Sequence, residues 1–231
     1  MDVKILGIVG SPRKGGNTEV MIGAALEAAR SLGGVQTDIV LMAGRKVSPC
    51  KGCSHCWFHQ GVCAIKDDAY EIVQEMVDAD GLIIGSPVYF GSITATLKAL
   101  LERCLRLNIL KKQADTMDYE EIKDEEVIFP LRNKVGGAIS VGGVQSGGQE
   151  RVIIDIHGFF LLNDMIVVTD GGIRTPEVHP HFGGVGIGRG KKQVEKDPYG
   201  MATSQSVGLR VAEVAKLIKL GTQLSQREKA T

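Results

Sequence analysis

Short apolar runs rich in β-branched residues recur along this chain, and a segment with helical spacing separates each run from the next. The first run, VKILGIV at 3–9, is typical of a buried strand and ends at a turn-forming segment. The predicted strands cover residues 3–9, 37–42, 81–87, 134–143 and 164–171, and the predicted helices cover residues 18–31, 67–80, 93–105, 150–162 and 205–220. Strands that alternate with helices form a parallel sheet with helices on both faces.

Five such strands predict a doubly wound α/β fold with the strand order 2-1-3-4-5, which is the flavodoxin-like arrangement. A chain of 231 residues can bury a full core, so we expect residues 1–231 to form a single domain. Two segments, about 108–133 and 174–198, exceed the ~12–15 residues usual for a structureless loop. We expect each of them to be a functional insertion or an interface arm.

Charge and hydropathy exclude several classes of partner. The chain has 27 basic and 27 acidic residues, so it lacks the charge excess of a nucleic-acid-binding protein. No apolar run approaches the ~20 residues that span a bilayer, and the first residues lack the pattern of a signal peptide. We therefore expect a cytoplasmic protein that binds neither nucleic acid nor membrane, with its cysteines kept reduced.

The segment GSPRKGGNT at 10–18 lies between the first predicted strand and the first predicted helix. In this fold a helix start at the carboxyl end of a strand offers free N–H groups and a positive dipole to an anion. The segment is neither a P-loop nor GxGxxG, which favours a monophosphate such as that of FMN over ATP or a dinucleotide. A glycine-rich turn without a ligand is the alternative. The predicted phosphate contacts are Ser11, Arg13, Gly16, Asn17 and Thr18.

A second loop, GSPVYFGS at 85–92, ends the third strand, which neighbours the first strand in the predicted order. Tyr89 and Phe90 could form the wall of an isoalloxazine ring, with hydrogen bonds from the peptide after Gly91, or both aromatics could belong to the core. A third loop at 140–150 would close the far side of the ring. The predicted flavin contacts here are Pro87, Val88, Tyr89, Phe90, Gly91, Ser92, Gly142 and Gly143.

Four of the five cysteines lie within one loop, about 47–66, with the spacing Cys50-x2-Cys53-x2-Cys56-x6-Cys63. Successive x2 intervals let one loop bind three corners of a cubane, as in the bacterial ferredoxin run. Three other roles for these cysteines are less favoured. Structural zinc more often uses two CxxC pairs that are a dozen or more residues apart. Disulfides conflict with the expected reducing compartment, and a dithiol relay would leave two of the four cysteines without a role. We therefore predict a [4Fe–4S] cluster on these four cysteines, with zinc as the alternative. Cys104, among apolar neighbours, is expected to be buried.

The sequence GSPRKGGNTE followed by GSPVYFGSITATLKALLER resembles the NADPH-dependent FMN reductase superfamily. With the cysteine run between these loops, the chain resembles the iron–sulfur flavoproteins of anaerobic archaea and bacteria, and the resemblance covers about residues 3–171. It implies FMN and a [4Fe–4S] cluster in an oxidoreductase that passes electrons from ferredoxin, or a similar low-potential donor, to a small acceptor such as dioxygen or peroxide. No residue is assigned a catalytic role.

The resemblance also implies a homo-oligomer, a dimer or a tetramer, in which the flavin and the cluster of neighbouring subunits approach one another. Direct oxidation of NAD(P)H stays open as the source of electrons. Two alternative functions remain at this point. One is an NAD(P)H-dependent FMN or quinone reductase with a structural zinc site, and the other is a non-catalytic electron carrier.

Overall fold

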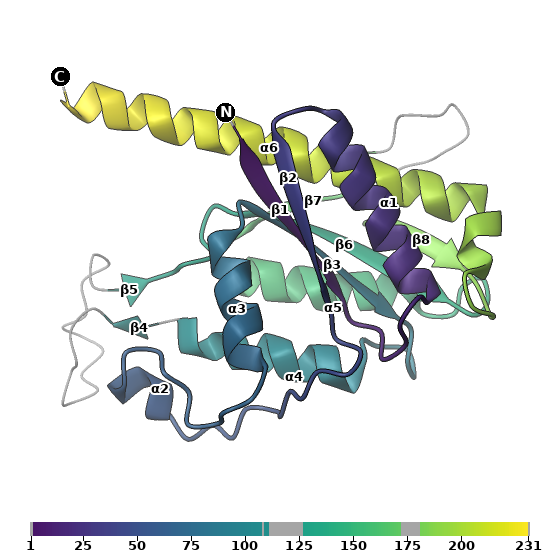
Figure 1. Cartoon of the computed structure of the whole chain (residues 1–231), viewed down its shortest axis with the longest axis horizontal. Helices are drawn as coiled ribbons and strands as arrows, with labels where there is room; N and C mark the ends of the chain where they lie inside the picture. Colours follow the sequence, from purple (N-terminus) through teal and green to yellow (C-terminus); the bar gives the residue numbers. More distant parts are fainter. Residues whose placement is uncertain (1, 108, 111–126, 172–180, 231) are drawn as a thin grey trace.

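The computed structural model describes residues 2–107, 109–110, 127–171 and 181–230. Its centre is a parallel sheet with helices packed against both faces (Figure 1). The strands of this sheet are β1 (Val3–Val9), β2 (Val35–Leu41), β3 (Gly81–Pro87), β6 (Val135–Gly142), β7 (Ile166–Val168) and β8 (Gly184–Ile187). The helices are α1 (Asn17–Ser31), α2 (His55–Phe58), α3 (Ala69–Asp78), α4 (Ala95–Arg103), α5 (Gln149–Leu162) and α6 (Pro198–Ala230), with 3-10 turns η1 (Cys104–Leu107) and η4 (Gln193–Lys196).

The sheet has the order β2-β1-β3-β6-β7, which confirms the predicted order 2-1-3-4-5 of the flavodoxin-like fold. One strand, β8, was not predicted. It pairs in parallel with residues 139–142 of β6, whereas β7 pairs with residues 135–137 of the same strand. Because β3 occupies the other edge of β6, β7 and β8 lie one after the other on a single edge and together take the place of a fifth strand.

Both predicted insertions therefore contain ordered pieces. The segment at 174–198 holds β8 and η4, which were not predicted, while its residues 174–180 lie outside the described residues. Its role as an insertion or interface arm stays a prediction. In the segment at 108–133, β4 (Ile109–Leu110) and β5 (Val127–Ile128) form a separate antiparallel pair. Residues 108 and 111–126 lie outside the described part of the chain.

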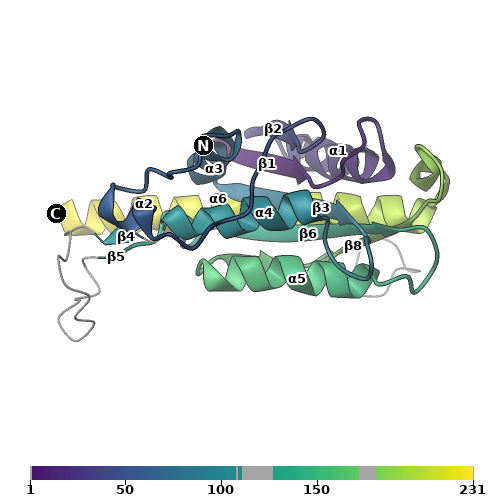
Figure 2. The ribbon, with the colours of Figure 1, turned by 90° about the horizontal axis from the view of Figure 1, so that it is seen from below.

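The side chains of the sheet alternate between two hydrophobic cores, as the two-residue period of a strand requires. In β1, Leu6 and Ile8 pack into the core formed with α3, α4 and α5, whereas Ile5 and Val9 pack into the core formed with α1 and α6. Figure 2 shows α5 running alongside β6. Both faces of β1 are buried, so this strand carries an apolar run rather than an alternating pattern.

Two glycines set how closely α1 approaches the sheet. A Cβ atom added to Gly7 would lie 2.6 Å from Ile22 Cγ2, and one added to Gly85 would lie 2.7 Å from Ile22 Cδ1. Real side chains do not make contacts this short, so α1 could not pack at this distance if either residue were larger. The close approach sets how near α1 lies to β1 and β3.

The last helix, α6, is longer than predicted. It begins at Pro198, where the Asp197 carboxylate accepts a hydrogen bond from Gly200 N at 3.0 Å in a helix cap, and it continues to Ala230. Its first half packs on α1 and the sheet, and its carboxyl end extends beyond the sheet (Figure 1). Of the helices that the structure describes, none is both long and apolar enough to cross a membrane.

Candidate functional site

A cavity of about 480 Å³ opens at the carboxyl ends of β1, β3 and β6, where this fold binds its ligands. Most of the residues that the sequence assigned to the flavin lie around it. The predicted residues that line the cavity are Ser11, Arg13, Gly16, Asn17, Thr18, Pro87, Val88, Tyr89, Gly142 and Gly143. The structure adds Lys14, Val141, Gly188, Arg189, Gly190 and Lys191.

The loop before α1 forms one side of the cavity. Gly16 is the N-cap residue and supplies no side-chain acceptor to the first turn of the helix. Ser11 Oγ accepts a hydrogen bond from Arg13 N at 3.1 Å, and the Glu19 carboxylate accepts one from Gly15 N at 2.6 Å, so the loop holds its own shape. A helix start of this kind presents N–H groups and the positive end of its dipole to an anion.

Asn17 has partners that the sequence did not predict. Its Nδ2 donates to the carbonyl oxygens of Gly188 and Gly190, both at 2.9 Å, and its Oδ1 accepts a hydrogen bond from Val194 N at 3.2 Å. The amide thus binds the loop that follows β8 to the loop that precedes α1. In this structure Asn17 positions one wall of the cavity, whereas the sequence suggested a donor to the phosphate.

The loop after β8, residues 188–191, forms a fourth wall that sequence reasoning missed. Gly188 N donates to Gly142 O and Arg189 Nε donates to Gly143 O, each at 2.9 Å. Lys191 extends over Gly15, because a Cβ atom added there would meet Lys191 Cε at 3.2 Å. The signal in the sequence was the run GIGRGKK at 186–192, which combines glycines with cations, but without β8 this run had no place in the sheet.

The charge around the cavity favours an anionic ligand. Four cations, Arg13, Lys14, Arg189 and Lys191, line it, and its described lining includes no carboxylate. Their side chains are exposed at the mouth, so solvent screens them, and the N–H groups of the loop supply the closer contacts. Cations together with a free helix start are the donors that a phosphate group requires.

The second flavin loop is a tight turn. Tyr89 and Ser92 exchange backbone hydrogen bonds at 2.9 and 3.1 Å, and Phe90 and Gly91 between them have φ values of +49° and +74°, as in a type I′ turn. Tyr89 lines the cavity, whereas the Phe90 side chain is fully exposed and Ser92 Oγ donates to Asp155 Oδ2 at 2.5 Å. Phe90, Gly91 and Ser92 do not line this cavity in the structure, so their contact with a flavin stays a prediction.

Thr94 joins the two flavin loops and was also missed. Its hydroxyl donates to Gly10 O at 2.6 Å and accepts a hydrogen bond from Leu97 N at 3.3 Å, while its own N–H donates to Ser86 Oγ at 3.1 Å. The side chain is therefore both the N-cap of α4 and a buried link between the ends of β1 and β3. A Thr directly before a helical run was the available signal.

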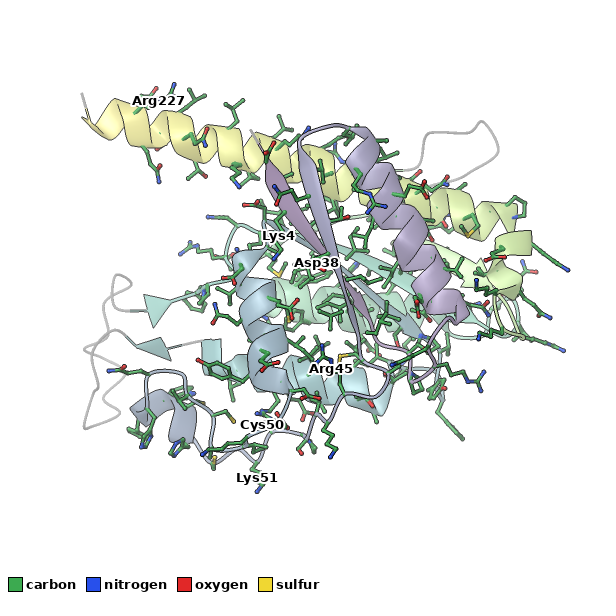
Figure 3. All side chains as sticks on the ribbon, in the orientation of Figure 1. Lys4, Asp38, Arg45, Cys50, Lys51 and Arg227 are labelled. Atoms are coloured by element: carbon green, nitrogen blue, oxygen red, sulfur yellow. The ribbon has the colours of Figure 1, made fainter. Side chains whose placement is uncertain are left out.

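The four cysteines of the predicted cluster lie together on the loop between β2 and α3, which includes the short helix α2. Cys53 is exposed, whereas Cys50, Cys56 and Cys63 are half-buried. Figure 3 shows Cys50 at the outer edge of the molecule. All four are free thiols, and Cys104 is buried as predicted. The loop therefore offers four sulfur donors at one end of the protein.

The sulfurs are close enough to influence one another. Burial raises the pKa of the Cys56 thiol, and the charges of Cys63, Cys50 and Cys53 raise it further. A thiol of this kind gives up its proton readily only when a positive centre binds the thiolate. A bound metal centre would offset this repulsion by neutralising the thiolates.

The described residues contain no group of three His, Cys, Asp or Glu side chains that is gathered tightly enough to hold one metal ion. A tetrahedral zinc site needs four thiolates at about 2.3 Å from a single ion. A [4Fe–4S] cubane instead binds each of four thiolates to a different iron, so its ligands stand farther apart. Four cysteine thiolates are the donor set of a [4Fe–4S] cubane and also that of a structural zinc site.

Comparison with known proteins identifies the relatives of this chain. Residues 3–179 match the family described as NADPH-dependent FMN reductase. An iron–sulfur flavoprotein of Methanocaldococcus jannaschii is 42% identical to this chain, and the match covers 94% of this chain and 100% of the relative. An iron–sulfur flavoprotein of Methanosarcina thermophila is 40% identical, and the match covers 94% of this chain and 97% of the relative. A solved structure of a flavodoxin, a WrbA-like protein from Agrobacterium tumefaciens, has a TM-score of 0.60 at 13% identity, over 94% of this chain and 99% of that one. This structural likeness bears on the fold alone.

Proposed function

Because this chain belongs to the NADPH-dependent FMN reductase family, and within it to the iron–sulfur flavoproteins, we propose that it is an oxidoreductase that passes electrons between FMN and a [4Fe–4S] cluster. FMN would occupy the cavity of about 480 Å³, and Cys50, Cys53, Cys56 and Cys63 would hold the cluster. Flavins exchange one or two electrons and such clusters normally exchange one, so the pair can split or join electron pairs.

One observation carries the proposal. The predicted phosphate loop (residues 10–18) and the cysteine loop (about 47–66) begin at the ends of two neighbouring strands. β1 and β2 are parallel neighbours whose last residues, Val9 and Leu41, are paired in register, and Met42 N donates to Val9 O at 3.0 Å. The chain continues from Val9 into the phosphate loop and from Leu41 into the cysteine loop. The fold thus joins a candidate anion site to a four-thiol loop through adjacent strands.

The residues of the chain would bind and orient both groups. The start of α1, with Arg13 and Lys14, would hold the phosphate, and Tyr89 would lie against the ring. The loops at 142–143 and 188–191 would close the cavity and exclude water from it. The cysteine loop would supply the four thiolates.

We propose a ferredoxin-like protein as the electron donor and a small molecule as the acceptor. NAD(P)H is the alternative donor, and the described fold carries no dinucleotide fingerprint at the start of α1. Anaerobic stopped-flow measurements of flavin reduction by reduced ferredoxin, NADH and NADPH separate the two. Faster reduction by NADPH than by ferredoxin would favour the reductase alternative.

We also propose that the protein forms a homo-oligomer through the side of α4 and α5. A groove of about 700 Å³ between these helices includes Cys50, and the apolar side chains of Leu105, Ile154 and Leu162 around it are exposed. Exposed apolar patches of this kind are typical of interaction surfaces. Sedimentation equilibrium of the protein and of an Ile154→Lys variant tests the proposal, which predicts an assembly for the first and a smaller species for the second.

A matched pair of cysteine variants tests the cluster. Cys63→Ala removes one proposed ligand, and Cys104→Ala removes the buried thiol outside the cysteine loop. We expect Cys63→Ala to keep its FMN but to lose or alter the cluster, as measured by labile sulfide and by electron paramagnetic resonance, while Cys104→Ala keeps both groups. Loss of FMN together with the cluster in Cys63→Ala would indicate that the cysteine loop is needed for folding instead.

A further inference from the structure

A buried arginine lies behind the cysteine loop. Arg103 is the last residue of α4, and its side chain is only 2% exposed. One of its nitrogens pairs with Asp67 Oδ2 at 2.8 Å, and the Asp67 side chain is 7% exposed. Buried charges are costly unless they are paired, so a charge at this position needs a structural or functional reason.

The arginine fastens both ends of the cysteine loop. Its Nη1 donates to Ser48 O and its Nη2 donates to Ile65 O, each at 3.1 Å. Asp67 Oδ2 also accepts a hydrogen bond from Ser48 N at 2.8 Å. Ser48 precedes the first cysteine and Ile65 follows the last one, so the guanidinium and its carboxylate close the loop at its base.

The same guanidinium lies next to a proposed cluster ligand. Its Nη2 donates to Ile65 O at 3.1 Å, and Ile65 N in turn donates to Cys63 Sγ at 3.5 Å, so the guanidinium lies close to this sulfur. An arginine keeps its charge in proteins, and here Asp67 pairs with it at 2.8 Å. The Arg103 Nε is buried and has no hydrogen-bond partner within the described residues. A buried N–H group is rarely left without a partner, so this donor calls for an explanation.

Arg103 also connects the two candidate sites through a short helix. Thr94, at the start of α4, donates to Gly10 O of the phosphate loop, and Arg103 ends the same helix at the cysteine loop. Nine helical residues span about 13 Å. The position of the cysteine loop is therefore set by an element that is anchored at the flavin cavity.

We propose that Arg103 is a positioning residue for the cluster, which orders the cysteine loop and holds a fixed positive charge beside the Cys63 ligand. The inference rests on the proposed cluster. One-electron reduction adds a negative charge to the cluster, and a nearby cation stabilises that reduced form, as do hydrogen bonds to the ligand sulfurs. Arg103 would therefore raise the reduction potential of the cluster.

Two substitutions that remove opposite charges test this inference. Arg103→Gln removes the cation, and Asp67→Asn removes the anion that offsets it while leaving an acceptor oxygen for Ser48. We expect the cluster potential, from redox titration followed by electron paramagnetic resonance, to become more negative in Arg103→Gln and more positive in Asp67→Asn. The FMN potential, measured in the same samples by visible absorption, should stay close to that of the parent protein. A residue with a purely structural role would not shift the cluster potential in opposite directions in the two variants.

Hydrogen exchange of residues 48–65 in the cluster-free protein provides a readout that needs no cluster. We expect faster exchange in Arg103→Gln than in Arg103→Lys, since lysine keeps the charge and part of the hydrogen bonding. A full cluster at an unchanged potential in Arg103→Gln, or unchanged exchange of its cysteine loop, would overturn the inference and leave the proposed function intact. Failure of the parent protein to bind iron and sulfide would overturn both.

Discussion

Replacing Thr94 with valine removes one hydroxyl that has two partners and keeps the shape of the side chain. The change abolishes the N-cap of α4, which costs about 1 kcal/mol. It also leaves the buried Gly10 carbonyl without its 2.6 Å hydrogen bond, at a cost of about 1–2 kcal/mol. The free energy of unfolding should therefore fall by about 2–3 kcal/mol, within the ~5–15 kcal/mol of an ordinary domain, so the variant should still fold.

Urea denaturation of the FMN-free protein measures this loss, and fluorescence titration with FMN measures its effect on the cavity. Because Thr94 fixes the phosphate loop to the ends of β1 and β3, we expect the dissociation constant for FMN to rise several-fold in Thr94→Val. Thr94→Ser retains the hydroxyl and serves as the control, with a loss of less than about 1 kcal/mol. Equal losses in the two variants would refute the assigned role of the hydroxyl.

Three further predictions concern the fourth wall, pH and helix packing. Asn17→Ala frees the loop after β8 and should raise the dissociation constant for FMN about tenfold, which is ~1.4 kcal/mol in a calorimetric titration; unchanged affinity would contradict its role. Burial lowers the pKa of His157 below its usual 6.5, so the folded state binds fewer protons there than the unfolded state. Stability should fall as pH drops through the window just below 6.5, and His157→Phe should flatten that dependence in denaturation midpoints from pH 5 to 7.5; an equal slope in both proteins would refute this cause. A Cβ at Gly208 would overlap the Ala25 carbonyl, so Gly208→Ala should lower the unfolding free energy by about 1–3 kcal/mol, whereas Gly221→Ala, with open space around it, should be neutral or stabilising. Similar thermal stabilities of these two glycine variants would contradict the packing.

Local pattern was enough to predict the central part of the fold. The strands before the flavin loops are buried on both faces, so their apolar runs stand out from the flanking turns. β8 was not predictable in this way, because its sequence GVGI is short and half glycine. It joins the sheet because its glycines admit close neighbours, and a Cβ atom added to Gly186 would lie only 2.6 Å from Met21 Sδ. Such contacts depend on distant residues.

In the candidate site, too, some features could be predicted from local sequence and others depend on distant residues. The spacing of the four cysteines and the glycines before α1 are local signals, and they pointed to the thiol donors and to the anion site. The partners of Asn17 lie more than 170 residues away in the sequence, at 188 and 190, so no local pattern could predict them. Arg103 likewise reads as a surface residue at the end of a helix, until the fold places it behind the cysteine loop.

In the proposed function, one chain carries both a flavin and an iron–sulfur cluster. Anaerobic purification followed by analysis of iron, labile sulfide, zinc and FMN tests it most directly. We expect about four iron and about four sulfide ions, together with one FMN, for each chain. About one zinc ion for each chain without labile sulfide would contradict the cluster, and failure of the protein to bind added FMN would contradict the flavin site.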